Sequence, residues 1–206
     1  MNISDDAISA PNRLSITYCP AHSRPFFELI LAFDSRLKDV ASRNTEPLIA
    51  QLRLAWWRDA ITQSETINRA GEPLLAQLSA MTDAKMAATA RSSMLDLLTA
   101  WEHIIVAPDD ANAAHEYASM RSNAVFGGFL IANSVPVAEE VIALGRIWAL
   151  QDIGLLDDPA QNRRMSPMLR KRSYRALTIL AYAVQLQSGL DRGAGVKLSW
   201  HALTGR

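Results

Sequence analysis

One arginine inside an apolar helical pattern is the first residue of this chain that could do chemistry. Residues 46–61, EPLIAQLRLAWWRDAI, are apolar around most of a helical circumference, which is typical of a buried helix. Arg53 falls inside that apolar arc, close to Trp57. A guanidinium keeps its charge, so a buried one needs a carboxylate, a phosphate or carbonyl groups as partners. Arg53 therefore belongs either to a structural ion pair with another helix, for example with a buried Asp34, or to one wall of a ligand cavity.

A second candidate is the cationic start of the last long helix, which the pattern predicts over residues 167–188. Cations are locally unfavourable at a helix N-terminus. One interpretation is therefore an anionic partner, such as a lipid headgroup, a diphosphate or another protein, and the other is a solvated basic face. The residues concerned are Arg170, Lys171, Arg172 and Arg175, near Tyr174.

Motif and charge content exclude several function classes. No HExxH, CxxC or GxxxxGK[ST] string is present, so the usual zinc and P-loop signals are absent. Lys+Arg and Asp+Glu both number 21, which argues against a nucleic-acid binder that works by bulk charge. The single cysteine, Cys19, suits a reducing compartment. No stretch reads as a secretory signal or a transmembrane span.

The elements that must position these residues are helices. Apolar residues recur at helical spacing through most of the 206 residues, and strand signals are weak. We therefore expect an all-α chain of six or seven helices, with an N-terminal arm over residues 1–22 and one helical domain over 23–206. Within the first helix Asp34 and Lys38 lie four residues apart, as in an ordinary helix-stabilising pair.

Two adjacent glycines interrupt a helical pattern in the middle of the chain. Gly127 and Gly128 each cost about 1 kcal/mol relative to alanine in a helix. Close approach of another helix would explain that cost, and so would space for a ligand.

Four segments give the chain a resemblance to the squalene/phytoene synthase family, over roughly residues 18–158. The helix at 46–61 is the most specific, and it is most similar to the non-synthase branch that includes the mitochondrial complex I assembly factor of this family. The terminal LTGR resembles the ending of short bacterial members. The resemblance implies a single-domain bundle of the isoprenoid synthase type around a central cavity, shortened at its C-terminus. The four segments are LILAFDSRLKDV, EPLIAQLRLAWWRDAI, EYASMRSNAVFGGFL and ALGRIWALQDIGLLDD.

In synthases of this family, two aspartate-rich helices face each other across the cavity. Each presents carboxylates four residues apart on one helix face, and together they bind Mg²⁺ ions that hold a prenyl diphosphate and assist departure of the diphosphate. In this chain the register of the first motif falls on Lys38 and Ser42, and no two aspartates are four residues apart. We therefore expect no intact catalytic or metal-binding set. The degenerate candidates are Asp34, Asp39, Asp152 and Asp157, with Asp158 beside the last.

The substrate-clamping tyrosine element of the family is recognisable at Tyr117, and Arg121 lies one turn later on the same helix face. With Arg53 and Trp57, these two residues are the expected ligand-binding set. The first hypothesis is a protein that has lost prenyltransferase catalysis and uses no cofactor. It would bind a prenyl diphosphate or isoprenoid lipid, or would assist assembly of a membrane protein complex. For a bacterial chain this implies a cytoplasmic protein, free or peripheral on the inner membrane.

Two other hypotheses stay open. A plain helical interaction module would have a core closed by its tryptophans and no ligand. An active transferase would condense prenyl diphosphates in squalene- or phytoene-type biosynthesis. It would need Mg²⁺ held off-register by Asp34, Asp39, Asp152, Asp157 and Asp158.

Overall fold

The computed structural model describes residues 9–43, 46–63, 71–156 and 167–187. Within these ranges every regular element is a helix and no β-strand occurs, so the predicted all-α class is confirmed. None of the described helices combines the length and the apolar content that a membrane span requires. The α-helices are α1 (Ala10–Thr17), α2 (Arg24–Arg43), α3 (Pro47–Thr62), α4 (Pro73–Ser79), α5 (Ala84–Val106), α6 (Ala111–Ser122), α7 (Gly128–Ala132), α8 (Glu139–Asp152) and α9 (Arg175–Gln187), with a π-helical turn η2 (Asn123–Gly127) between α6 and α7 and the 3₁₀ turns η4 (Pro167–Arg170) and η5 (Arg172–Tyr174) before α9.

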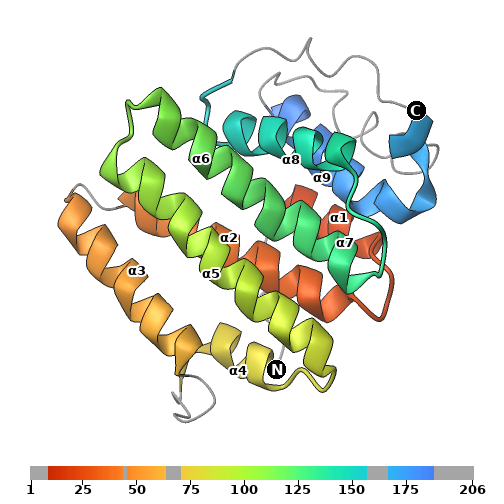
Figure 1. Ribbon diagram of the computed structural model, residues 1–206, viewed down its shortest axis with the longest axis horizontal. Helices are drawn as coiled ribbons and strands as arrows, with labels where there is room; N and C mark the ends of the chain where they lie inside the picture. The colour runs from red at the N-terminus through yellow and green to blue at the C-terminus, as the bar shows by residue number, and fades with distance from the viewer. Residues whose placement is uncertain (1–8, 44–45, 64–70, 157–166, 188–206) are drawn as a thin grey trace.

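The helices form a bundle in which α2 and α5 run side by side through the middle (Figure 1). On one side α6 packs against α5, α8 against α6 and α9 against α8. On the other side α3 packs mainly against α5, and α4 against α2 and α5. Phenylalanines from α2, η2 and α7 fill much of the core, and the rings of Phe27 and Phe129 lie 4.8 Å apart. The bundle is therefore built around α2 and α5.

Local chemistry explains where several helices begin. The side chains of Asp83 and Asp110 accept hydrogen bonds from backbone N–H groups at the starts of α5 and α6, at 3.0 and 2.9 Å. This is the usual role of an N-cap carboxylate. Pro47 and Pro73 stand at the first positions of α3 and α4, where a missing N–H costs nothing.

The N-terminal segment differs from the expected arm. Residues 10–17 form α1, which packs against α9 near the other end of the described chain. Ser15 Oγ donates to the backbone carbonyl of Ala176 at 2.8 Å, and Ser15 and Ile16 are buried. These residues belong to the bundle because α9 provides a surface that covers them.

Close helix approach explains one glycine of the Gly127-Gly128 pair. A Cβ on Gly128 would collide with Ser93 Oγ and would lie 2.9 Å from Phe26 Cζ. A Cβ on Gly127 would meet only Ile142 Cδ1, at an ordinary 3.6 Å. Gly128 is therefore needed for packing of α7 against α5 and α2, and no ligand space is required to account for it.

One side of α3 is open to solvent. Leu54 and Trp57 face the bundle, and the Trp57 ring meets Phe33 edge-on with centroids 5.0 Å apart. Leu48 and Leu52, in contrast, are 66% and 63% exposed. The expectation that the helix over 46–61 is buried around its circumference is wrong, because α5 and α2 cover it from one side only.

Candidate functional site

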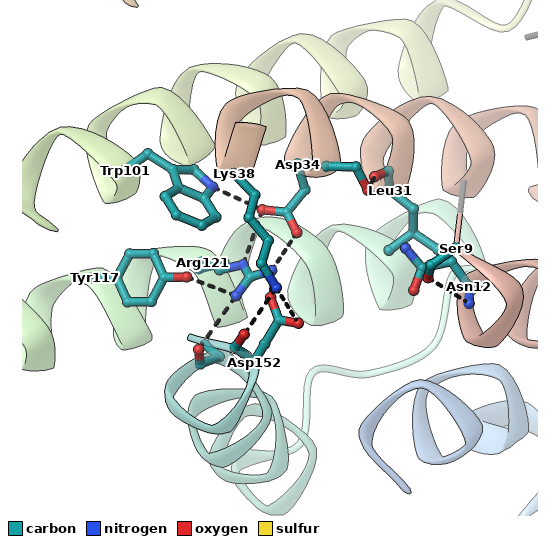
Figure 2. A network of polar contacts seen from close by, with 11 residues as sticks. Ser9, Asn12, Leu31, Asp34, Lys38, Trp101, Tyr117, Arg121 and Asp152 are labelled. Atoms are coloured by element: carbon teal, nitrogen blue, oxygen red, sulfur yellow. Dashed lines mark hydrogen bonds and ion pairs between the residues drawn. The ribbon is translucent and has the colours of Figure 1, made fainter. Parts of the chain in front are cut away.

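A buried cluster of charged side chains lies where α2, α5, α6 and α8 meet, with Arg121 at its centre (Figure 2). Arg121 Nε donates to Asp34 Oδ1 at 2.9 Å, and Nη2 donates to Asp34 Oδ2 at 2.6 Å and to Asp152 Oδ2 at 2.7 Å. Nη1 donates to Tyr117 Oη at 2.7 Å and to the backbone carbonyl of Ala149 at 3.3 Å. A guanidinium has five N–H donors, so each of them has an acceptor within the protein.

The carboxylate of Asp34 is the anchor on α2. It is 4% exposed and receives a third hydrogen bond from Trp101 Nε1 on α5, at 2.9 Å. The carboxylate therefore joins α2 to both α5 and α6. The indole N–H of Trp101 is also satisfied, as a buried tryptophan requires.

Lys38 completes the group at its partly exposed edge. Its Nζ donates both to Asp152 Oδ1 and to the backbone carbonyl of Asp152, each at 2.9 Å. Asp152 is the last residue of α8, where a cation also complements the helix dipole. The predicted pairing of Lys38 with Asp34 is thus replaced by pairs to other helices. We call Asp34, Lys38, Tyr117, Arg121 and Asp152 the Arg121 cluster.

The Arg121 cluster is balanced in charge, with two carboxylates and two cations. Burial alone raises the pKa of Asp152, but the charges and hydrogen bonds of Arg121 and Lys38 outweigh it and lower that pKa. Burial lowers the pKa of Arg121, yet the charge of Asp34 outweighs this and raises it well above its ordinary value. Burial raises the pKa of the Tyr117 phenol. At neutral pH, Asp152 and Arg121 therefore stay charged and the Tyr117 phenol stays neutral. None of these three groups is suited to proton transfer at that pH.

Aromatic rings enclose the guanidinium of Arg121. Its Cζ lies 4.1 Å from the centroid of Trp148, 5.1 Å from that of Trp101 and 5.6 Å from that of Tyr117. These contacts suit a planar cation, which is attracted to ring faces. The rings also exclude water, so Arg121 is only 1% exposed.

The structure brings four of the predicted site residues together: Asp34, Tyr117, Arg121 and Asp152. Asp39 lies apart, in a surface pair with Arg43 at 3.1 Å. Asp157, like Asp158, lies outside the described residues.

Arg53 and Trp57 are also separated from the Arg121 cluster. Arg53 is exposed, so the expectation that it lies in a buried arc is wrong. The reason is that Arg53 projects from the side of α3 that α5 and α2 leave uncovered. Trp57 is 4% exposed and packs into the core. Among the described residues, the buried arginine is Arg121, and its partner is the Asp34 that the sequence suggested for Arg53.

The basic segment near the C-terminus also differs from its prediction. Arg170 ends the 3₁₀ turn η4, Arg172 begins η5, and Lys171 lies between the two turns; all three are exposed, and the helix itself begins at Arg175. Most of these cations therefore precede the helix and do not occupy its first turn.

Comparison of the chain with family profiles, with characterised proteins and with solved structures finds no match.

The Arg121 cluster does not fit a Mg²⁺ site of the kind that the family resemblance describes. Mg²⁺ needs about six oxygen ligands in octahedral geometry, and the described residues contain no group of three or more acidic, histidine or cysteine side chains that could supply them. Both oxygens of Asp34 and both of Asp152 already accept hydrogen bonds. An ion at these carboxylates would have to displace the fully bonded guanidinium of Arg121.

The sequence did not indicate the partners of two members of the site. Trp101 stood among the apolar positions of its helix, and nothing in its spacing indicated a hydrogen bond to Asp34. Lys38 suggested only a local pair, whereas its partner Asp152 lies 114 residues away. Contacts of this kind depend on how distant helices pack together, and the periodicity of the sequence does not show that packing.

Proposed function

We propose that this protein is a non-catalytic member of the squalene/phytoene synthase type, with an isoprenoid synthase bundle, and that it works by binding a partner. The observation that supports this most directly is the ion pairing of Asp34 and Asp152 with Arg121. The two best-placed candidates for an off-register metal site, Asp34 and Asp152, are thus paired with a cation of the chain itself.

The positions of the two carboxylates support the same proposal. By the resemblance, the aspartate motifs of a synthase belong to the helices that correspond to α2 and α8. Asp34 and Asp152 come from these two helices and converge on one nitrogen, Nη2 of Arg121. The guanidinium thus joins α2 and α8, the two helices whose counterparts would hold Mg²⁺ in a synthase according to the resemblance.

A closed centre of this kind favours a scaffold over a transferase. Removing buried charges from their partners is costly, so substrate entry would have to disrupt the Arg121 cluster before any chemistry. We infer that binding an isoprenoid, or aiding assembly of a membrane protein complex, is the role of this bundle.

The test is incubation of the full chain with farnesyl diphosphate and Mg²⁺, following pyrophosphate release and thermal stability. We expect no release above a protein-free blank. Mg²⁺-dependent release that Asp152→Asn abolishes would contradict the proposal and favour a transferase. A rise in melting temperature with farnesyl diphosphate, but not with inorganic pyrophosphate, would identify an isoprenoid as the partner.

A further inference from the structure

The outer side of α3 carries a stripe of apolar side chains. Four of the eight large apolar residues that are strongly exposed in the described part of the chain lie on this one helix. Their spacing places them on one face, which lies at the edge of the bundle (Figure 1). A contiguous exposed patch of this kind marks an interaction site more often than scattered apolar residues do. The α3 stripe consists of Leu48, Ile49, Leu52 and Trp56.

A groove lined by arginines runs beside the α3 stripe. It has a volume of about 350 Å³ between α2 and α3, and Arg36, Arg43 and Arg53 line it. Trp56 and Trp57 contribute to its wall, so Trp56 belongs to both the stripe and the groove. Apolar surface and guanidinium groups are therefore continuous on this face.

The two carboxylates of the arginine groove are already engaged. Asp39 pairs with Arg43 at 3.1 Å, and Glu72 accepts a backbone hydrogen bond at the start of α4. Arg36 and Arg53 have no ion pair with any described residue. Two guanidinium charges thus remain available for an anion, and phosphate is one of the two anions, with carboxylate, that their planar geometry suits.

We propose that the α3 stripe and the arginine groove together form a docking surface for a bilayer that contains anionic phospholipids. Helices that lie in a membrane interface combine an apolar face with flanking cations and aromatic residues. Leu48 and Leu52 would enter the acyl region, while Arg36 and Arg53 would bind headgroup phosphates. Charge complementarity favours this occupant over a second copy of the chain, since a two-fold contact would oppose the same cations.

This inference does not depend on whether the Arg121 cluster is catalytic, because it concerns the outer face of the protein. The experiment is co-sedimentation of the full chain with vesicles of phosphatidylcholine alone and with equal parts of phosphatidylcholine and phosphatidylglycerol. We expect binding to the anionic vesicles, weaker binding to the neutral ones, and a marked loss when salt is raised from 0.05 to 0.5 M.

Two variants with matched controls assign the binding to this face. Leu52→Glu should weaken binding about tenfold or more, and Arg53→Gln about fivefold. Leu155→Glu and Arg24→Gln make the same chemical changes at exposed positions on other parts of the surface, and both should bind as the wild type does. A blue shift of tryptophan fluorescence on vesicle binding should shrink in Trp56→Phe.

Several results would overturn the inference. One is equal binding of Leu52→Glu and wild type, and another is absence of sedimentation with anionic vesicles. A concentration-dependent dimer that Leu52→Glu dissociates, without vesicle binding, would assign the α3 stripe to a second copy. Stabilisation by soluble pyrophosphate that Arg53→Gln removes, again without vesicle binding, would assign the arginine groove to a soluble phosphate ligand.

Discussion

Arg121 and Asp34 form a two-point ion pair in the protein interior, with N···O distances of 2.9 and 2.6 Å between residues that are 87 positions apart. Their side chains are 2% and 6% exposed. Burying a charge is tolerated only when its partners are well placed, so this pair specifies how α6 docks on α2.

Replacing Arg121 should destabilise the fold strongly. Arg121→Met leaves the carboxylates of Asp34 and Asp152 in the interior without their main cation, and we expect a loss of about 3–5 kcal/mol in the free energy of unfolding. Urea denaturation measures this loss. The matched control is Arg58→Met, which breaks a pair with Glu102 whose side chains are 41% and 45% exposed. That surface pair should contribute less than about 1 kcal/mol. Equal losses in the two variants would show that the buried ion pair stabilises the fold no more than the surface pair does.

A double-mutant cycle should find strong coupling between Asp34 and Arg121. Asp34→Leu and Arg121→Met each leave a buried charge without its main partner, whereas the double variant removes both charges, so the effects should fall short of additivity by about 1–3 kcal/mol. Chemical denaturation of the four proteins gives the coupling energy. The same cycle on the exposed Asp39–Arg43 pair should yield about 0.5 kcal/mol or less. Additive effects at Asp34 and Arg121 would show that the ion pair does not stabilise the fold.

Stability should fall in acid partly through Asp152. Arg121 and Lys38 lower the pKa of Asp152 in the folded state. Between the folded and the unfolded pKa of this residue, the unfolded chain therefore binds more protons than the folded one. The contribution of Asp152 is therefore complete above the unfolded pKa of about 3.9 and is lost as the pH falls through the lower folded value. Asp152→Asn should flatten the acid part of a stability profile measured by urea unfolding between neutral pH and pH 2.5.

Asp96 provides a control of opposite sign for that profile. Burial raises the pKa of Asp96, so its ionisation in the folded state opposes stability as the pH rises through that pKa. Asp96→Asn should consequently make the acid limb steeper. Flattening by both substitutions would contradict the assignment of the acid transition to the Arg121 cluster.

The two adjacent glycines should respond differently to alanine. Gly128→Ala places a Cβ against Ser93 and Phe26, and overpacking of this kind costs about 1–3 kcal/mol. Gly127→Ala adds only an ordinary contact with Ile142, and the better helix propensity of alanine offsets small losses, so we expect a change within about 1 kcal/mol. Thermal melting of both variants tests the difference. Similar melting temperatures would mean that α7 can shift away from α5 at little cost.

The adjacent tryptophans should separate stability from surface binding. Trp57 is buried against Phe33, and Trp57→Ala should cost about 3–5 kcal/mol. Trp56 is 43% exposed and contacts Trp57 edge-on with centroids 5.0 Å apart, so Trp56→Ala should cost about 1 kcal/mol. Denaturation measures both losses. If Trp56→Ala proves as damaging as Trp57→Ala, the outer face of α3 is part of the core and not a free surface.

The sequence by itself determined the helices and most of the cluster's members. Apolar residues at helical spacing, together with capping aspartates and prolines at helix starts, are local signals. They predicted the all-α class and placed α3 to within a residue of its observed bounds. Tyr117 was expected from the family resemblance, and Arg121 was added because it lies one turn later on the same helix face.

Only the tertiary structure decided which arginine is buried and what pairs with it. Arg53 and Arg121 both stand in helices with apolar neighbours, but α3 is covered on one side, whereas α6 lies between α5 and α8. Periodicity identifies an apolar face and cannot say whether another helix covers it. The partners Asp34 and Asp152 reach Arg121 only because distant helices pack at particular positions along their lengths. That packing is a property of the whole bundle, and for this reason the Arg121 cluster and the open α3 stripe emerge only in three dimensions.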